Sequence, residues 1–207
     1  MLSSIHPLGE RARNQHWGVT VSAYIAGSTV GGAITGLAAG SIGAGLATQL
    51  SPGSSVVYMP VLYMIVAAVT GIGFWADLSG RKLPTVHRQV NEDWLDQYRG
   101  WVYGIGFGFQ LGLGWATIIT TSLVYSTFLL AALTGSPLGG TLIGFVFGLA
   151  RALPILTTQM ATSAGQLVAF HKRMADSAAR ARKLGAAAQG VVSIAAVLAS
   201  ATVLLRV

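Results

Sequence analysis

Five long apolar blocks constrain this chain more than any other feature of its sequence. They are residues 19–50, 56–76, 100–133, 138–170 and 184–205, and Arg151 in the fourth block is the one charged residue inside them. A helix needs roughly 20 apolar residues to cross the hydrocarbon core of a bilayer. Only 9% of the residues are charged, against about 25% in an ordinary soluble domain. The pattern predicts an all-α polytopic membrane bundle of five transmembrane helices.

The charged residues between the blocks predict how the chain is divided and oriented. We expect a cytoplasmic tail at residues 1–17, a single transmembrane domain at 18–207, and cytoplasmic loops at 77–99 and 171–183. The tail and the two loops carry two, four and five of the 13 Lys and Arg residues. Because basic residues collect on the cytoplasmic side of membranes, the N-terminus is expected inside and the C-terminus outside, in the inner membrane of a bacterium.

Three blocks are longer than one perpendicular span requires, but too short for two helices and a turn. Long tilted helices, or helices broken near their glycines, both fit this length. Small residues spaced four apart let a second helix approach closely, and a proline interrupts helix hydrogen bonding. The residues expected at helix-packing positions are Gly32, Gly36, Gly40, Gly108, Gly112 and Pro154. A loosened helix that lines a polar cavity is the other interpretation of the glycine-rich third block.

Glycine-rich stretches in three of the blocks carry a family resemblance. GFGFQLGLGWATIITT (residues 106–121) resembles the fourth transmembrane helix of the cytochrome c biogenesis and thiol–disulfide interchange family, the CcdA/DsbD transmembrane domains. GFVFGLARALPIL (144–156) resembles the helix that follows it in that family. YIAGSTVGGAITGLAAG (24–40) and the second apolar block are similar to the family's second and third helices. The resemblance covers most of residues 20–205 and implies that the family's helical membrane fold carries over.

The chain departs from this family where the family's chemistry resides. The helix that carries the first reactive cysteine has no counterpart in the resemblance, and Ile118 stands at the place of the second cysteine. Thr117 and Thr121 replace the flanking prolines, and the sequence contains no cysteine at all. Since a thiolate is the nucleophile of thiol–disulfide exchange, we expect no thiol redox activity.

Arg151 is the candidate site residue, because an arginine at the centre of a membrane helix costs about 2.5–3.5 kcal/mol on the insertion scale. Asp77 is assigned to the loop 77–99, so no carboxylate is expected inside the membrane to neutralise this charge. Three interpretations remain open: the guanidinium binds carbonyls and hydroxyls at a kink, it binds an anionic solute or lipid headgroup in a polar cavity, or it meets a carboxylate of another subunit. The candidate neighbours are Gln110, Thr117, Thr121 and Gln159.

Two classes of function fit these features. The first is a non-catalytic subunit or assembly factor of a membrane complex, which the resemblance connects with respiratory or cytochrome biogenesis. The alternative is a transport or binding protein for a small anion, using Arg151. No nucleophile–base pair or metal-ligand set is recognisable, so we expect no enzyme activity, no catalytic residue, no metal and no cofactor. The expected partners are the lipid bilayer, a homo- or hetero-oligomeric membrane partner and an anionic lipid or small anion, but no nucleic acid.

Overall fold

The computed structural model describes residues 5–50, 55–80, 83–85, 93–160 and 163–205, and in these ranges the chain forms helices and no strand. This confirms the expected all-α class. The elements in chain order are α1 (Pro7–Ala12), α2 (Trp17–Leu50), α3 (Ser55–Leu78), α4 (Trp94–Gln97), α5 (Gly100–Gly112), α6 (Leu123–Leu133), α7 (Pro137–Ala152), the 3₁₀ helix η1 (Leu153–Met160) and α8 (Ala164–Leu204).

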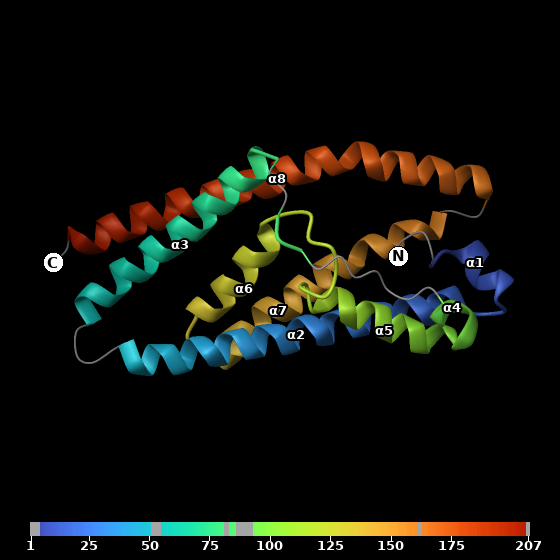
Figure 1. Ribbon diagram of the computed structural model, residues 1–207, viewed down its shortest axis with the longest axis horizontal. Helices are drawn as coiled ribbons and strands as arrows, with labels where there is room; N and C mark the ends of the chain where they lie inside the picture. Colours follow the sequence, from blue (N-terminus) through green and yellow to red (C-terminus); the bar gives the residue numbers. More distant parts are fainter. Residues whose placement is uncertain (1–4, 51–54, 81–82, 86–92, 161–162, 206–207) are drawn as a thin grey trace.

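The helices pack as two groups that α6 connects. Helix α2 makes its most extensive contacts with α7 and α5, and these three form one group. Helix α3 runs alongside the C-terminal half of α8 as a second group (Figure 1). Helix α6 contacts members of both groups, so the segment between α5 and α6 lies where the two groups meet (Figure 1).

Glycines mark the closest approach between α2 and α7. A Cβ atom added to Gly144 would overlap the carbonyl oxygen of Gly32, and one added to Gly36 would overlap the carbonyl oxygen of Gly140. The Ser28 hydroxyl donates a 2.7 Å hydrogen bond to the carbonyl oxygen of Gly148 across the same contact. Without side chains between them, the two backbones come into direct contact, which is how small residues stabilise helix pairs in lipid.

Glycines of α5 also approach the backbone of α2, next to the contact with α7. A Cβ on Gly108 would overlap the Tyr24 carbonyl, and one on Gly112 would overlap the Ser28 carbonyl. Gly40 lies against the backbone of Ser136, directly before α7. The glycines singled out from the sequence therefore lie at backbone contacts of α2 with α5 and α7.

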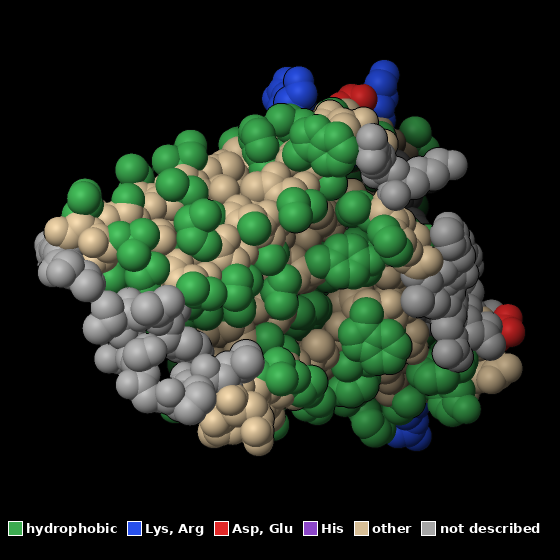
Figure 2. All heavy atoms as spheres, turned by 60° about the vertical axis from the view of Figure 1, so that its left-hand side comes forward, with side chains coloured by type: hydrophobic (Ala, Val, Ile, Leu, Met, Phe, Trp, Pro, Cys, Tyr) green, Lys and Arg blue, Asp and Glu red, His purple; other side chains and the backbone are tan. Residues whose placement is uncertain are grey.

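The outer surface is largely apolar, as expected for a chain in contact with lipid. Figure 2 shows one face of the molecule on which hydrophobic side chains dominate and charged side chains lie toward the edges. Among the described residues, four helices are long and apolar enough to cross a membrane, over Trp17–Gln49, Met59–Leu78, Pro137–Gln159 and Gly165–Leu204, and Leu123–Leu133 is a shorter apolar helix. These findings confirm a polytopic helical membrane bundle.

The third apolar block, residues 100–133, is not one continuous helix. It is divided into α5 and α6, and residues 113–122 between them are not α-helical. Gly114 within this segment has a φ of +74°, in the left-handed region that side-chain-bearing residues rarely occupy. By contrast, the long first block forms the unbroken helix α2. The first long block is therefore one continuous helix, and the third is a helix broken near a glycine.

The helix boundaries differ from the predicted division around residues 160–183, while the cytoplasmic location of residues 171–183 stays a prediction. Helix α7 continues into η1, which ends at Met160, and residues 164–170 already belong to α8. Residues 171–183 lie within α8, which starts with a capping box between Ser163 and Gln166. The reason is that alanine, arginine and lysine are strong helix formers, so the charge that indicated a loop does not interrupt the helix.

The predicted tail at 1–17 and loop at 77–99 contain helical residues, while their cytoplasmic location stays a prediction. The tail contains α1, and Ile5 is fully buried in a core cluster with residues of α2, α5 and η1. Helix α3 continues to Leu78, which places Asp77 inside the helix. Part of the predicted loop, residues 81–82 and 86–92, lies outside the described residues. Asp77 thus lies near the C-terminal end of a candidate membrane helix and not at the start of a loop.

Candidate functional site: the break between two half-helices

The break at residues 113–122 leaves two helix ends inside the bundle. An α-helix ends with carbonyl groups that have no partner within the helix, and it begins with N–H groups in the same condition. In a membrane protein such groups must be satisfied by other protein groups or by water in a cavity. Two charged side chains from other helices, Arg151 of α7 and Asp77 of α3, reach these two ends.

Arg151 lies at the C-terminal end of α5. Its Nη1 donates a 3.0 Å hydrogen bond to the carbonyl oxygen of Leu111, in the last turn of α5. Its Nη2 donates a 3.2 Å hydrogen bond to the hydroxyl of Thr117, inside the break. The guanidinium also lies 5.4 Å from the centre of the Phe147 ring, one turn earlier on α7. A cation at the C-terminal end of a helix is stabilised by the partial negative charge of the unpaired carbonyls.

Asp77 lies at the other end of the break, where α6 begins. Its Oδ1 accepts a 2.8 Å hydrogen bond from the backbone N–H of Ser122, the residue before α6. Its Oδ2 accepts a 3.1 Å hydrogen bond from Nε2 of Gln189 on α8. The residue is only 6% exposed. The carboxylate therefore caps α6 from a neighbouring helix and lies at its partially positive end.

A buried polar network extends from Asp77 and connects three helices. The Ser122 hydroxyl donates to the carbonyl oxygen of Gly73 in α3 at 2.9 Å. The Ser126 hydroxyl of α6 donates to Oε1 of Gln189 in α8 at 2.7 Å. Gln189, which is 2% exposed, thus both donates and accepts hydrogen bonds. Because each of these polar groups has a partner, the network is stabilising in a low-dielectric interior.

The arrangement as a whole matches opposite charges to opposite helix ends. The positive charge of Arg151 lies at the carbonyl end of α5, and the negative charge of Asp77 lies at the N–H end of α6. The two formal charges cancel within the bundle, and each is also offset by a helix dipole. The contacts therefore provide a structural reason for an arginine inside an apolar block.

The other residues predicted to surround Arg151 are placed differently. Among the described residues, its guanidinium donates hydrogen bonds to Leu111 and Thr117, and not to Gln110, Thr121 or Gln159. Gln110 and Thr121 are half-buried, and Gln159 is exposed on η1. Pro154 is the second residue of η1, where the helix narrows from α to 3₁₀ geometry, and its carbonyl accepts a 2.5 Å hydrogen bond from Thr157.

Ile118, at the place of the second family cysteine, lies within the break between the two half-helices. Its side chain is 44% exposed, in contrast to its buried neighbours Thr117 and Ile119. The backbone N–H of Ile119 donates a 2.8 Å hydrogen bond to the Thr85 hydroxyl. An exposed aliphatic group at this position supplies neither a nucleophile nor a ligand.

A second buried carboxylate holds the start of α5 against α1 and α2. Glu10 is fully buried and accepts hydrogen bonds from the Tyr103 hydroxyl at 2.6 Å and from the Thr20 hydroxyl at 2.6 Å. It also forms a 2.9 Å ion pair with Arg13. Burial lowers the pKa of Arg13, but the hydrogen bond and the charge of Glu10 outweigh this effect and raise it. The sequence does not reveal this cluster, because Glu10 lies in the predicted cytoplasmic tail and its partners Thr20 and Tyr103 lie in apolar blocks.

Substitution of Asp77 tests the capping of α6. Asp77→Leu removes the acceptor for both the Ser122 N–H and the Gln189 amide, and it should lower the free energy of unfolding by about 3 kcal/mol. Asp77→Asn keeps an acceptor for Ser122 and should cost only about 1 kcal/mol, through the lost charge at the helix end. Denaturant unfolding of the purified protein in detergent measures both effects.

Asp176, which is exposed on α8, provides the matched control for this substitution. Asp176→Asn should change the unfolding free energy by no more than about 0.5 kcal/mol. Equal stability of Asp77→Leu and the unsubstituted protein would show that Asp77 does not cap α6.

Comparisons with known proteins agree with the resemblance described above. A model of the family described as cytochrome C biogenesis protein transmembrane region matches residues 3–199. The chain is 26% identical over 183 residues to the methylamine utilization protein MauF of Methylophilus methylotrophus, which covers 86% of this chain and 61% of that protein. It is 28% identical over 187 residues to MauF of Paracoccus versutus, covering 86% of this chain and 64% of that protein.

A third relative extends this group. MauF of Methylobacillus flagellatus is 28% identical over 160 residues, covering 74% of this chain and 53% of that protein. The chain thus spans less than two thirds of the length of these curated relatives. No solved structure matches it.

Proposed function

Because the chain belongs to the family of cytochrome c biogenesis protein transmembrane regions, we propose that it is a non-catalytic membrane subunit or assembly factor in the biogenesis of a redox system. The proposal places it in the inner membrane of a bacterium. It gives the protein a scaffold role, in which its helices hold or position a partner in the membrane. It includes no thiol redox step and no enzyme activity.

The observation that carries the proposal is the use of Arg151 within the fold. Its guanidinium binds the Leu111 carbonyl and the Thr117 hydroxyl, so the most conspicuous polar group of the membrane region stabilises a helix end. The chain also contains no cysteine, and the resemblance puts Ile118 at the place of a reactive thiol. A thiol–disulfide relay requires thiolates, so the family's electron relay has no carrier in this chain. Both points support the proposal that this chain keeps the family's fold without its thiol–disulfide reaction.

The relatives suggest a more specific process. Several proteins similar to this chain are methylamine utilization proteins. We propose that the present chain acts in a related process, the production of a redox enzyme that oxidises an amine or of the cytochrome that accepts its electrons. The partner would be a membrane protein of that assembly system, bound along the exposed apolar helix faces.

Transport of a small anion is the second candidate. It is favoured by one observation, which is that a cation and a hydroxyl group, Arg151 and Thr117, meet inside a break between half-helices. Half-helix ends at membrane depth bind substrates in many transporters. It is disfavoured by the contacts of the guanidinium, which would have to leave the Leu111 carbonyl in order to bind a solute.

Gentle purification of the tagged full chain from its native membrane distinguishes the two functions. A scaffold should co-purify with a second polypeptide at a fixed ratio, and deletion of its gene should abolish accumulation of the mature redox enzyme while its transcript persists. A homo-oligomer without a partner, whose anion uptake in liposomes is lost on Arg151→Gln, would contradict the scaffold function and support transport.

A further inference from the structure

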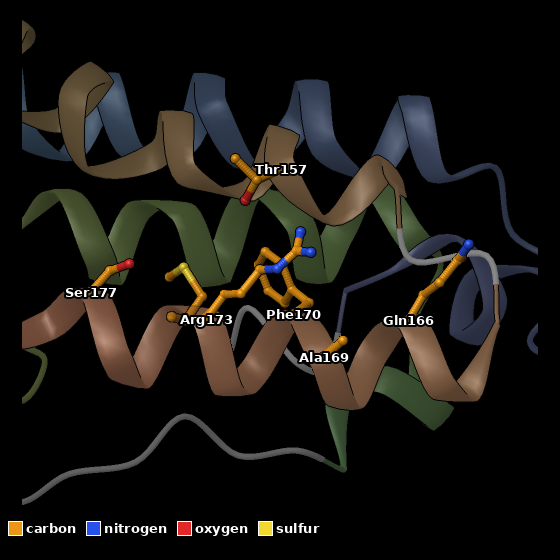
Figure 3. Close-up of a pocket in the computed structure, with 7 residues that line it drawn as sticks. Thr157, Gln166, Ala169, Phe170, Arg173 and Ser177 are labelled. Atoms are coloured by element: carbon orange, nitrogen blue, oxygen red, sulfur yellow. The ribbon is translucent and has the colours of Figure 1, made fainter.

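A cavity between η1 and the first half of α8 has the shape and composition of a ligand site. Its volume is about 420 Å³ and it is lined by Thr157 of η1 and by Gln166, Ala169, Phe170, Arg173, Met174 and Ser177 of α8. These positions on α8 are spaced three or four residues apart, so they form one helix face. Figure 3 shows this face turned toward Thr157, with Phe170 and Arg173 pointing toward η1. Cavities that bind small molecules have volumes of about 300–1,000 Å³.

The lining combines an apolar wall with polar groups that recognise an anion. Phe170, Ala169 and Met174 supply the apolar surface, and Arg173 supplies a cation beside it. Hydroxyl groups of Thr157 and Ser177 are also present. A guanidinium offers several N–H donors in a geometry that suits phosphate oxygens. The chemistry fits an amphipathic molecule with a phosphate group better than a free anion, which would have no use for the apolar wall.

The charge of this half of α8 is strongly positive. Residues 172–183 contain five Lys or Arg residues and one carboxylate, Asp176. Arg173 is exposed. Such a segment attracts anionic lipid headgroups.

The cavity lies on the same helix as a long apolar run. Residues 184–204 of α8 are apolar and follow the basic segment without a break, so the part of α8 that lines the cavity continues directly into a part that suits lipid. From these observations we propose that the cavity between η1 and α8 binds the headgroup of an anionic phospholipid, with Arg173 on the phosphate and Phe170 and Met174 against the start of an acyl chain.

The proposal is tested by lipid retention, which does not depend on the proposed scaffold function. The full chain is purified, loaded with phosphatidylglycerol or with phosphatidylcholine of the same acyl chains, and examined by native mass spectrometry. We expect preferential retention of phosphatidylglycerol. Arg173→Gln should reduce this retention roughly fivefold, the equivalent of one lost cation near a headgroup. Ala169→Trp, which fills the cavity and keeps the charge, should reduce it to a similar extent.

Arg180→Gln is the matched control, since Arg180 lies in the same basic segment but does not line the cavity. It should reduce retention much less than Arg173→Gln does. Equal losses from the two substitutions would overturn the proposal in favour of diffuse surface attraction. Displacement of the lipid by an equimolar amount of inorganic phosphate would overturn it in favour of a free-anion site. Equal retention of the two lipids would also overturn it.

Discussion

Replacing Arg151 with methionine should lower the free energy of unfolding by about 2–3 kcal/mol. The substitution removes hydrogen bonds from the guanidinium to the Leu111 carbonyl and the Thr117 hydroxyl, and hydrogen bonds to charged groups contribute roughly 1.5–3 kcal/mol each. Methionine offsets part of this loss, because an uncharged side chain is buried without the desolvation cost of a guanidinium. The Leu111 carbonyl at the end of α5 then keeps only its backbone hydrogen bonds, such as the one from the Gly114 N–H at 3.1 Å. Denaturant unfolding in detergent micelles measures the change.

The unfolding free energy of Arg151→Lys should lie between those of Arg151→Met and the unsubstituted protein. A lysine ammonium group keeps the charge, but it cannot reach both acceptors in the same fixed geometry. Arg182→Met, which removes an exposed arginine of α8, serves as the control and should change stability by no more than about 0.5 kcal/mol. If Arg151→Met were as stable as this control, the guanidinium would not be capping α5.

The Gly144→Ala substitution should destabilise the bundle by about 3 kcal/mol or more, or prevent its assembly. The added Cβ would overlap the Gly32 carbonyl and the Gly36 Cα, which are backbone atoms and cannot rotate away. Inserting even one methyl group into a close-packed contact typically costs about 1–3 kcal/mol. Here α2 and α7 would have to separate along a contact that glycines and a serine maintain. The fraction of protein that elutes as a folded species, and its unfolding free energy, report the effect.

Gly45 provides the opposite expectation within the same bundle. An added Cβ at Gly45 meets nothing within 4 Å, and alanine is favoured over glycine in a helix by about 1 kcal/mol. Gly45→Ala should therefore leave the bundle equally or more stable. A destabilisation of similar size at both positions would mean that general helix effects, rather than the α2–α7 contact, determine the result.

The sequence predicted the helical class, but not the location of the break. Both tilted and broken helices fitted the long blocks, and periodicity alone does not distinguish them. The left-handed φ of Gly114 is set by its place between α5 and the loop, and one glycine among many in this block gives no signal of its own. Similarly, one partner of Arg151 is a backbone carbonyl. Every residue has such a group, so the sequence does not show which one is bound.

Asp77 shows why charge patterning misplaces some residues. It directly follows an apolar block, and such an acid is usually the first residue of a loop. Its partners Ser122 and Gln189 are 45 and 112 positions away in the chain, so only the folded bundle brings them together. The basic segment of α8 is a different case, because charge indicates exposure to water and does not show whether the backbone is helical. Tertiary contacts decide the first case, and local helix propensity decides the second.

The central claim is that Arg151 is held by its own fold, and a double-mutant cycle with Thr117 tests it most directly. The unfolding free energies of Arg151→Met, Thr117→Val and the double variant are compared with that of the unsubstituted protein. If the 3.2 Å hydrogen bond between the two side chains is formed in the membrane protein, the losses should be non-additive, with a coupling energy of about 1–2 kcal/mol. Losses that add to within about 0.3 kcal/mol would contradict the claim.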